Sequence, residues 1–193
     1  GIDDVFFGSG SAASDLGRYF LFVGNDKPHK NVPRLVEAFR EVRRRDESLR
    51  LVMVGAAFER FAEVPGVITT GFVSVERLAA IYRGAIALVM PSLEEGFGLP
   101  VAEAMACGTP VIASDIPSLR EVTGGAALHA DARSVAELAS AMEEILGDVT
   151  LRQELAELGP KRAHAFTWKR CAELTRDAYR RLAPRQEHAG RML

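Results

Sequence analysis

The sequence predicts an α/β fold: a Rossmann-like parallel sheet of about six strands with helices on both faces. Three observations support this prediction. Short apolar runs of strand length alternate with helical patterns along the chain. The run Ala85–Met90 is continuously apolar, which is typical of a strand covered on both faces and makes it a central strand. The 193 residues, 48% hydrophobic and 26% charged, are enough for one domain with its own core.

The strands are expected where apolar or β-branched runs end at a turn signal. Six segments meet this description, at 19–23, 49–54, 67–71, 85–90, 110–114 and 126–129. Gly24 and Gly55 directly follow the first two runs, and Gly71 ends the third, so turns are expected at these carboxyl ends. In an open parallel sheet those ends form the edge where ligands bind.

The first three helices are expected from apolar residues at helical spacing and from their end signals. Asn31 is expected to cap the first helix and Ser74 the second. Pro100 lies where the first turn of the third helix should be, and Gly108 is the usual stop, so this helix should cover Leu99 to Cys107.

Four further helices complete the pattern. Asp115 is expected to cap a short helix, and Ser134 with Glu137 forms a capping box for the next. The last two helices are expected over 150–158 and 168–182. The final helix carries one apolar stripe, made of Trp168, Cys171, Ala172, Thr175, Ala178, Tyr179 and Leu182.

The stretch Pro91–Gly108, PSLEEGFGLPVAEAMACG, joins the central strand to the third helix. Its glycines bracket Phe97 and let backbone N–H groups approach a ligand closely. Glu95 in the loop and Glu103 in the helix have seven residues between them, so two acceptors flank the free N–H groups of a helix N-terminus. Phosphate binds readily at such a terminus. The pattern therefore indicates a ligand that is polyhydroxylic and phosphorylated.

The longer stretch EEGFGLPVAEAMACGTPVIAS resembles the donor-site signature of retaining glycosyltransferases of the GT-B fold, group 1 or family 4 type. Similarity runs from Gly1 through Leu182. The resemblance implies a donor-binding C-terminal domain that uses a nucleoside-diphosphate sugar as substrate and needs no cofactor. It also implies that Glu103 accepts hydrogen bonds from the ribose and that Glu95 lies near the transferred sugar. The backbone of Gly96, Phe97, Gly98 and Leu99 would lie near the sugar and diphosphate.

The resemblance also assigns the loop after the first strand. The family places an arginine directly after the strand's glycine and a lysine just before the helix, both on the diphosphate. Lys30 matches the lysine, and a cation beside a helix N-terminus is unfavourable unless an anion joins it. Asn25, after Gly24, stands where the arginine is expected, and Lys27 or His29 are the alternative cations. Lys30 and Glu95 are the predicted catalytic residues.

Two further residues come from the resemblance. The backbone of Val73 would read the nucleobase, and Leu78 would pack beside it. Leu78 is read equally well as a core residue. Val73 has the stronger case for a ligand contact, because it lies at the carboxyl end of a strand.

Composition restricts the class of protein. The net charge is −2 and the basic residues are dispersed, which argues against nucleic-acid binding. Cys107 and Cys171 lie in apolar helical contexts and are expected to be buried, reduced thiols, which favours the cytoplasm. No apolar run is long enough to span a membrane, although peripheral association of a full-length enzyme stays open. No Asp-x-Asp is present, so no metal is expected at the diphosphate.

The predicted organisation is an interdomain linker remnant at 1–18, a nucleotide-sugar-binding domain at 19–182 and a flexible tail at 183–193. The segment Gly8–Ala13 matches G-x-G-x-x-A, but no strand precedes it, so it is expected to be a flexible linker. An N-terminal acceptor domain is the implied partner. Alternatives are a nucleotide-sugar epimerase, a phosphorylase-like GT-B enzyme, or a degenerate, non-catalytic nucleotide-binding module, which Asn25 would favour. The loop sequence PHKN resembles that of some mannosyltransferases, which implies mannose as the transferred hexose.

Overall fold

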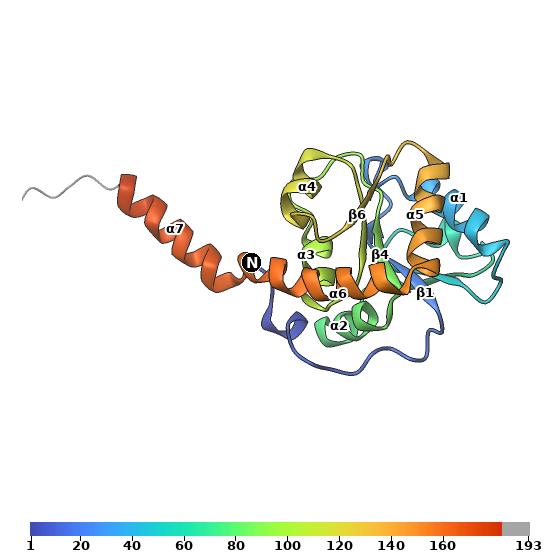
Figure 1. Ribbon diagram of the computed structural model, residues 1–193, viewed down its shortest axis with the longest axis horizontal. Helices are drawn as coiled ribbons and strands as arrows, with labels where there is room; N and C mark the ends of the chain where they lie inside the picture. Colours follow the sequence, from blue (N-terminus) through green and yellow to red (C-terminus); the bar gives the residue numbers. More distant parts are fainter. Residues whose placement is uncertain (183–193) are drawn as a thin grey trace, which may run out of the picture.

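The computed structural model describes residues 1–182 and places six strands in one sheet (Figure 1). Their spatial order is β3-β2-β1-β4-β5-β6, and all neighbours are parallel. The strands are β1 (Tyr19–Asn25), β2 (Arg50–Ala56), β3 (Val67–Gly71), β4 (Ala87–Met90), β5 (Val111–Ser114) and β6 (Leu128–Ala130). The predicted Rossmann-like sheet is confirmed, and β4 lies in its centre between β1 and β5.

Helices cover both faces of this sheet, as the sequence predicts (Figure 1). α1 and α5 pack against each other on one face, whereas α3 packs against α2, α4 and α6 on the other. The α-helices are α1 (Val32–Arg43), α2 (Val75–Gly84), α3 (Leu99–Ala106), α4 (Pro117–Thr123), α5 (Val135–Gly147), α6 (Val149–Ala163) and α7 (Trp168–Leu182). Four short 3-10 turns are η1 (Asp4–Phe6), η2 (Pro28–Lys30), η3 (Glu59–Phe61) and η4 (His164–Phe166).

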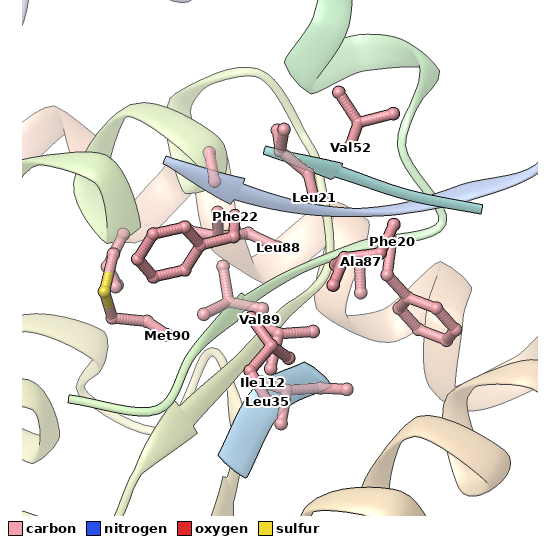
Figure 2. Packing of buried hydrophobic residues seen from close by; sticks show 14 of the residues in the cluster. Phe20, Leu21, Phe22, Leu35, Val52, Ala87, Leu88, Val89, Met90 and Ile112 are labelled. Atoms are coloured by element: carbon pink, nitrogen blue, oxygen red, sulfur yellow. The ribbon is translucent and has the colours of Figure 1, made fainter. Parts of the chain in front are cut away.

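The hydrophobic core is continuous across β1 and β4 (Figure 2). Phe20, Leu21 and Phe22 in β1 alternate between the two faces of the sheet, and all three are fully buried. Leu88 and Val89 in β4 are equally buried. Burial on both faces explains why these strands read as continuous apolar runs. Each such side chain contributes about 1.5 to 3 kcal/mol when it leaves water.

Some predicted boundaries are wrong. β4 begins only at Ala87, where its regular pairing with Phe20 of β1 starts, although Ile86 already donates its N–H to the Tyr19 carbonyl. The helix expected over 150–158 continues to Ala163, with Pro160 inside it. Its packing against α3 explains this continuation: a Cβ on Gly159 would lie 3.1 Å from the Met105 carbonyl oxygen. Tertiary packing here overrides the local signal of a proline.

The helix caps are partly as predicted. Ser74 accepts a hydrogen bond from the Arg77 N–H, and Ser134 accepts one from the Glu137 N–H. The capping box is only half formed, because the Glu137 carboxylate accepts from the Asp131 N–H instead of reaching back to Ser134. The prediction that Asp115 caps a helix is wrong. α4 starts at Pro117, and the Asp115 carboxylate pairs with Arg120.

Residues 1–18 contact the domain at several points, whereas Gly8–Ala12, within the stretch expected to be a flexible linker, are exposed and belong to no helix or strand. Ile2, Phe6, Ala13 and Leu16 are buried in this segment. The Ile2 N–H donates to the Phe166 carbonyl, and the Phe6 ring meets the Tyr82 ring edge-on at 5.8 Å. Whether this segment joined a second domain stays a prediction.

α7 extends away from the body of the domain (Figure 1). Its predicted apolar stripe is present and lies exposed to solvent, with Trp168 58%, Tyr179 71% and Leu182 81% accessible. Cys171 lies in this stripe, so the expectation that both cysteines are buried is wrong for Cys171; Cys107 is half-buried, and both thiols are free. The tail predicted over 183–193 lies outside the described residues. Within residues 1–182, no helix has both the length and the apolarity to cross a membrane.

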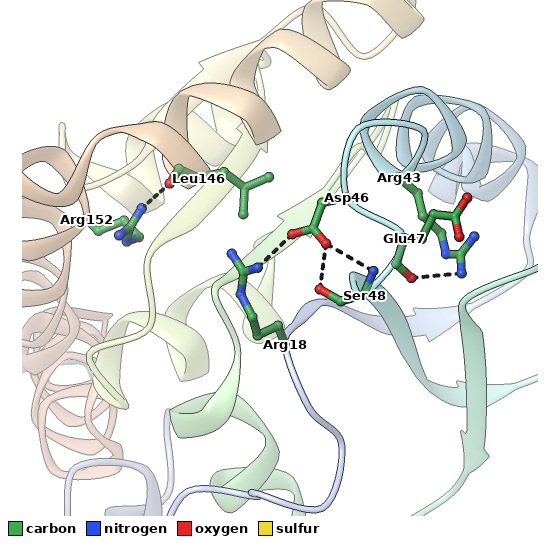
Figure 3. A network of polar contacts seen from close by, with 7 residues as sticks. All are labelled: Arg18, Arg43, Asp46, Glu47, Ser48, Leu146 and Arg152. Carbon is green, nitrogen blue, oxygen red and sulfur yellow. Dashed lines mark hydrogen bonds and ion pairs between the residues drawn. The ribbon is translucent and has the colours of Figure 1, made fainter.

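A polar network holds the turns at the amino ends of β1 and β2 (Figure 3). The Arg18 guanidinium donates to the Asp46 carboxylate at 2.7 Å, and the Ser48 N–H and hydroxyl donate to the same carboxylate. Arg43 donates to the Glu47 carbonyl at 2.9 Å. These contacts fix the edge of the sheet opposite to the carboxyl ends of the strands.

Candidate functional site

The carboxyl ends of β1 and β4 form the topological switch point of the sheet. The chain passes from β1 outward to β2, whereas β4 is followed by β5 on the other side. The two loops that leave these strands in opposite directions therefore form a crevice, where open α/β sheets bind ligands. The loops are joined by a hydrogen bond of 2.7 Å from the Leu93 N–H to the His29 carbonyl.

Asn31 is the residue that holds this crevice together. It is buried with a left-handed backbone, φ 57°, and its side chain does not cap α1 as the sequence predicts. Instead its amide donates to the carbonyls of Pro91 at 3.1 Å and Ala132 at 2.6 Å. Asn31 thus ties the ends of β4 and β6 to the start of α1 and fixes the backbone that carries Lys30. Its side-chain role depends on residues 60 and 101 positions away.

Lys30 and Glu95 meet across the two loops. The Lys30 ammonium contacts Glu95 Oε1 at 2.6 Å, and both side chains are largely buried, with 14% and 10% exposed. The hydroxyl of Ser92, a residue that the sequence did not single out, donates to the same oxygen at 2.8 Å. Glu95 is therefore the anion that joins Lys30 at the helix N-terminus. The two predicted catalytic residues form one ion pair at the switch point.

The loop Gly96–Leu99 presents backbone donors beside this ion pair. Among residues 1–182, no acceptor takes the N–H groups of these four residues. Gly98 has φ 92°, and a Cβ there would lie 2.6 Å from Leu119 Cδ2, so glycine is required. A hollow of about 400 Å³ lined by His29, Glu94, Glu95 and Gly96 opens next to the loop. Free N–H groups next to a cation are the arrangement that binds phosphate.

Glu103 lies in the second turn of α3 and meets a neutral partner. The Tyr82 hydroxyl, on α2, donates to Glu103 Oε2 at 2.9 Å. Burial raises the pKa of the Glu103 carboxyl, the Tyr82 hydrogen bond partly offsets that rise, and the negative charge of Asp3 adds to it. Burial also raises the pKa of Tyr82 well above its usual value, so the phenol remains a proton donor.

Gly24 and Asn25 end β1, where the first loop begins. A Cβ on Gly55 would lie 1.8 Å from the Gly24 carbonyl oxygen, so β1 and β2 approach too closely for a side chain there. The Asn25 side chain turns back and accepts from the Lys27 N–H at 3.2 Å. Arg60, from η3, pairs with Asp26 in the same loop at 2.5 Å. This brings to the loop a guanidinium that local sequence patterns do not reveal.

Val73 lies in the turn just before α2 and Leu78 lies near the start of α2, and both are partly buried against the core. Leu78 is four residues before Tyr82, so both side chains share one face of the helix. α2 therefore places Leu78 on the side of the helix that reaches Glu103. The structure brings together Lys30 with Glu95, whereas Val73 and Leu78 are linked to Glu103 only through this helix.

Comparisons with known proteins identify the family of this chain. A family model described as glycosyl transferases group 1 matches residues 17–148. The O-antigen chain mannosyltransferase B of Escherichia coli is 32% identical over 176 residues, which are 85% of this chain and 46% of that protein. The chain spans about half the length of this relative and of two others that it matches over most of its own length.

Solved structures of other proteins share the fold of this chain. Sucrose-phosphate synthase from Thermosynechococcus elongatus superposes with a TM-score of 0.74 and 26% identity, over 89% of this chain and 49% of that one. The C-terminal domain of a group 1 glycosyl transferase from Francisella tularensis shares the fold at 21% identity, TM-score 0.70, over 86% of this chain and 98% of that one. The family predicted from the glycine-loop motif is confirmed: this chain belongs to the group 1 glycosyltransferases.

Proposed function

We propose that this chain is the donor-binding half of a retaining glycosyltransferase that transfers a hexose from a nucleoside-diphosphate sugar. The observation that carries the proposal is the Lys30–Glu95 ion pair at the switch point, directly before the loop Gly96–Leu99, whose N–H groups have no acceptor among residues 1–182. A diphosphate there would accept charge-assisted hydrogen bonds from the ammonium and further bonds from the backbone. Glu103, on the helix that follows, would accept hydrogen bonds from the ribose.

Lys30 can donate hydrogen bonds to the diphosphate while it keeps its contact with Glu95. An ammonium has three N–H donors, and Glu95 Oε1 takes one of them. The remaining donors would stabilise the negative charge that develops on the leaving diphosphate during transfer. This proposal needs no metal ion, because the positive charge comes from Lys30 and from oriented N–H groups.

Glu95 is the proposed contact for the transferred sugar. One of its oxygens is occupied by Lys30 and Ser92, which leaves Oε2 to accept from sugar hydroxyls. The relative from Escherichia coli is named a mannosyltransferase, which supports mannose as the hexose and GDP-mannose as the first donor to test.

The acceptor would bind to a second domain, since transfer needs an acceptor hydroxyl held against the sugar and water excluded from the site. The apolar stripe of α7 is the proposed contact to that N-terminal domain. We also propose the cytoplasm as the compartment, where nucleotide sugars would be the substrates, with peripheral membrane association left open for a full-length enzyme.

A second candidate function is a degenerate nucleotide-binding module. The observation that favours it is that Asn25 replaces a cation and folds back on its own loop, while Arg60 is held by Asp26. An epimerase or a phosphorylase-like enzyme on the same fold are further alternatives.

Calorimetry separates these functions. The chain is titrated with GDP, UDP and ADP and with a sugar conjugate of each, with EDTA and again with Mg²⁺. We expect at least one nucleoside diphosphate and its sugar conjugate to bind as tightly in EDTA as in Mg²⁺. We expect no sugar transfer by the chain alone in a radiolabel assay. Binding of no nucleotide would contradict the proposal. Binding that depends on Mg²⁺ would contradict the proposed metal independence. Sugar transfer by the chain alone would contradict its assignment as only the donor-binding half of the enzyme.

A further inference from the structure

We propose that Tyr82 is a positioning residue for donor binding: its hydroxyl fixes one carboxylate oxygen of Glu103, so that the other oxygen faces the ribose of the ligand. This inference rests on the proposed function, because it assigns Glu103 to the ribose of a nucleotide. Tyr82 is fully buried, and its hydroxyl donates to Glu103 Oε2 at 2.9 Å. It therefore acts through Glu103 and not by touching the ligand.

The two oxygens of Glu103 have different surroundings. Oε2 accepts from Tyr82, whereas no group among residues 1–182 donates to Oε1. In the same part of the chain, Arg43 Nε is the one buried side-chain polar atom without a partner. Glu103 Oε1 also lacks a partner but is not among the buried atoms without one, so it is accessible to solvent. The carboxylate thus has one oxygen held inside and one open to a hydroxyl donor.

The position of Tyr82 itself is rigid. Its ring packs edge-on against Phe6, with the ring planes at 77°. Its backbone carbonyl accepts from the Thr109 hydroxyl at 2.7 Å, which ties α2 to the end of α3. A side chain held by its ring and its backbone can orient Glu103 before any ligand arrives, which reduces the cost of ordering on binding.

Packing alone does not require this hydroxyl. A phenylalanine would fill nearly the same space without bringing a polar group into the core. The Tyr82–Glu103 contact instead places a partly buried carboxylate beside a fully buried phenol, and neither group has a compensating cation in this contact. Burying a carboxylate without a cation costs free energy. A role in ligand binding gives that cost a reason.

The charged and titratable groups around Glu103 determine its response to pH. They are Tyr82 from α2, Asp3 from the segment before η1, and Cys107, the C-cap residue of α3, with Arg83 close to Cys107. The Tyr82 hydrogen bond is what lowers the pKa of Glu103 against the effects of burial and Asp3. Without the hydroxyl, that pKa rises further, so the ionised form is lost at a higher pH.

Tyr19 provides a matched control. It is also fully buried, and its hydroxyl donates to a protein acceptor, the Ile81 carbonyl, at 2.7 Å. Tyr19→Phe therefore removes a buried, hydrogen-bonded hydroxyl from the same core without touching Glu103. Both substitutions are expected to lower stability to a similar extent, and only Tyr82→Phe is expected to change ligand binding.

The test is calorimetry of the tightest-binding nucleoside diphosphate from pH 5 to pH 8, on the unchanged chain, Tyr82→Phe and Tyr19→Phe. We expect Tyr82→Phe to bind about tenfold more weakly at neutral pH, and to lose affinity at a higher pH than the unchanged chain as the solution is acidified. Tyr19→Phe should match the unchanged chain in both respects. In a Glu103→Gln background, Tyr82→Phe should cost little further affinity.

Three results would overturn the inference. If Tyr82→Phe keeps the affinity and the pH profile of the unchanged chain, Tyr82 is a core residue while the proposed function stands. If Tyr82→Phe still weakens binding tenfold in the Glu103→Gln background, it acts by another route. If the unchanged chain binds no nucleoside diphosphate, the proposed function and this inference fall together.

Discussion

Glu95 and Glu103 lie in the same short stretch of sequence, yet their carboxylates have opposite environments. Glu95, in the loop, is held by the Lys30 ammonium and the Ser92 hydroxyl. Glu103, in α3, is held by the neutral Tyr82 phenol, and its pKa is raised by burial. One carboxylate is compensated by charge and the other is not. The difference supports two proposed tasks: Glu95 would share a cation with the diphosphate, whereas Glu103 would offer a free oxygen to a hydroxyl.

Lys30→Ala should have the largest effect on this comparison. It removes the proposed cation partner of the diphosphate and leaves the Glu95 carboxylate largely buried with only Ser92 as its partner. We expect donor binding to weaken by about 1.5 to 3 kcal/mol, roughly ten- to a hundredfold. Lys161→Ala, at an exposed lysine of α6 away from this loop, is the matched control. Calorimetry that gives one dissociation constant for all three proteins would place the phosphate elsewhere.

The two carboxylates should separate by ligand. Glu103→Ala is expected to weaken a nucleoside diphosphate and its sugar conjugate alike, by about 1 to 2 kcal/mol, because the ribose is common to both. Glu95→Ala should weaken mainly the sugar conjugate. The free diphosphate keeps its contact with Lys30, and all three N–H donors of the Lys30 ammonium are then available to it.

Paired titrations with the two ligands check this separation. Glu63→Ala, at an exposed glutamate that does not line the hollow, is the control. Equal losses on both ligands for both variants would remove the assignment of ribose to Glu103 and sugar to Glu95.

The smallest effect concerns stability. A raised pKa means that folded Glu103 binds its proton more tightly than the unfolded chain does, so the free energy of unfolding falls as the pH rises through the folded pKa. Glu103→Gln removes this cost and can still accept from Tyr82. It should therefore raise stability at pH 8 by roughly 0.5 to 1 kcal/mol and by less at pH 4.5. Thermal unfolding at the two pH values measures this difference. A stability gain of equal size at both pH values would contradict the claim that the Glu103 charge lacks a compensating cation.

Much of the fold could be predicted because it depends on local patterns. β4 is buried on both faces, so its apolar run identified it as a central strand. Glycine and proline signals gave the limits of α3 to within one residue. The failures have a common cause in tertiary contacts. Asn31 has a good capping side chain, but distant carbonyls of Pro91 and Ala132 take its amide.

The candidate site was predicted only in part, because it too depends on tertiary contacts. Lys30 and Glu95 were found separately by motif, and Lys30 required an anion nearby, but nothing local showed that Glu95 supplies it. Tyr82 reads as one more apolar position of α2, because its acceptor Glu103 is on another helix. Polar partners that come together only when helices pack leave no periodic signal in the sequence.

The most direct measurement is a crystal structure of this chain with a nucleoside-diphosphate hexose that calorimetry shows to bind. The account predicts diphosphate oxygens within hydrogen-bonding distance of Lys30 Nζ and of the N–H groups of Gly96–Leu99. It also predicts a ribose hydroxyl on Glu103 Oε1 and a sugar hydroxyl on Glu95. A diphosphate bound away from the switch point, or one that leaves Lys30 in contact with Glu95 alone, would contradict it.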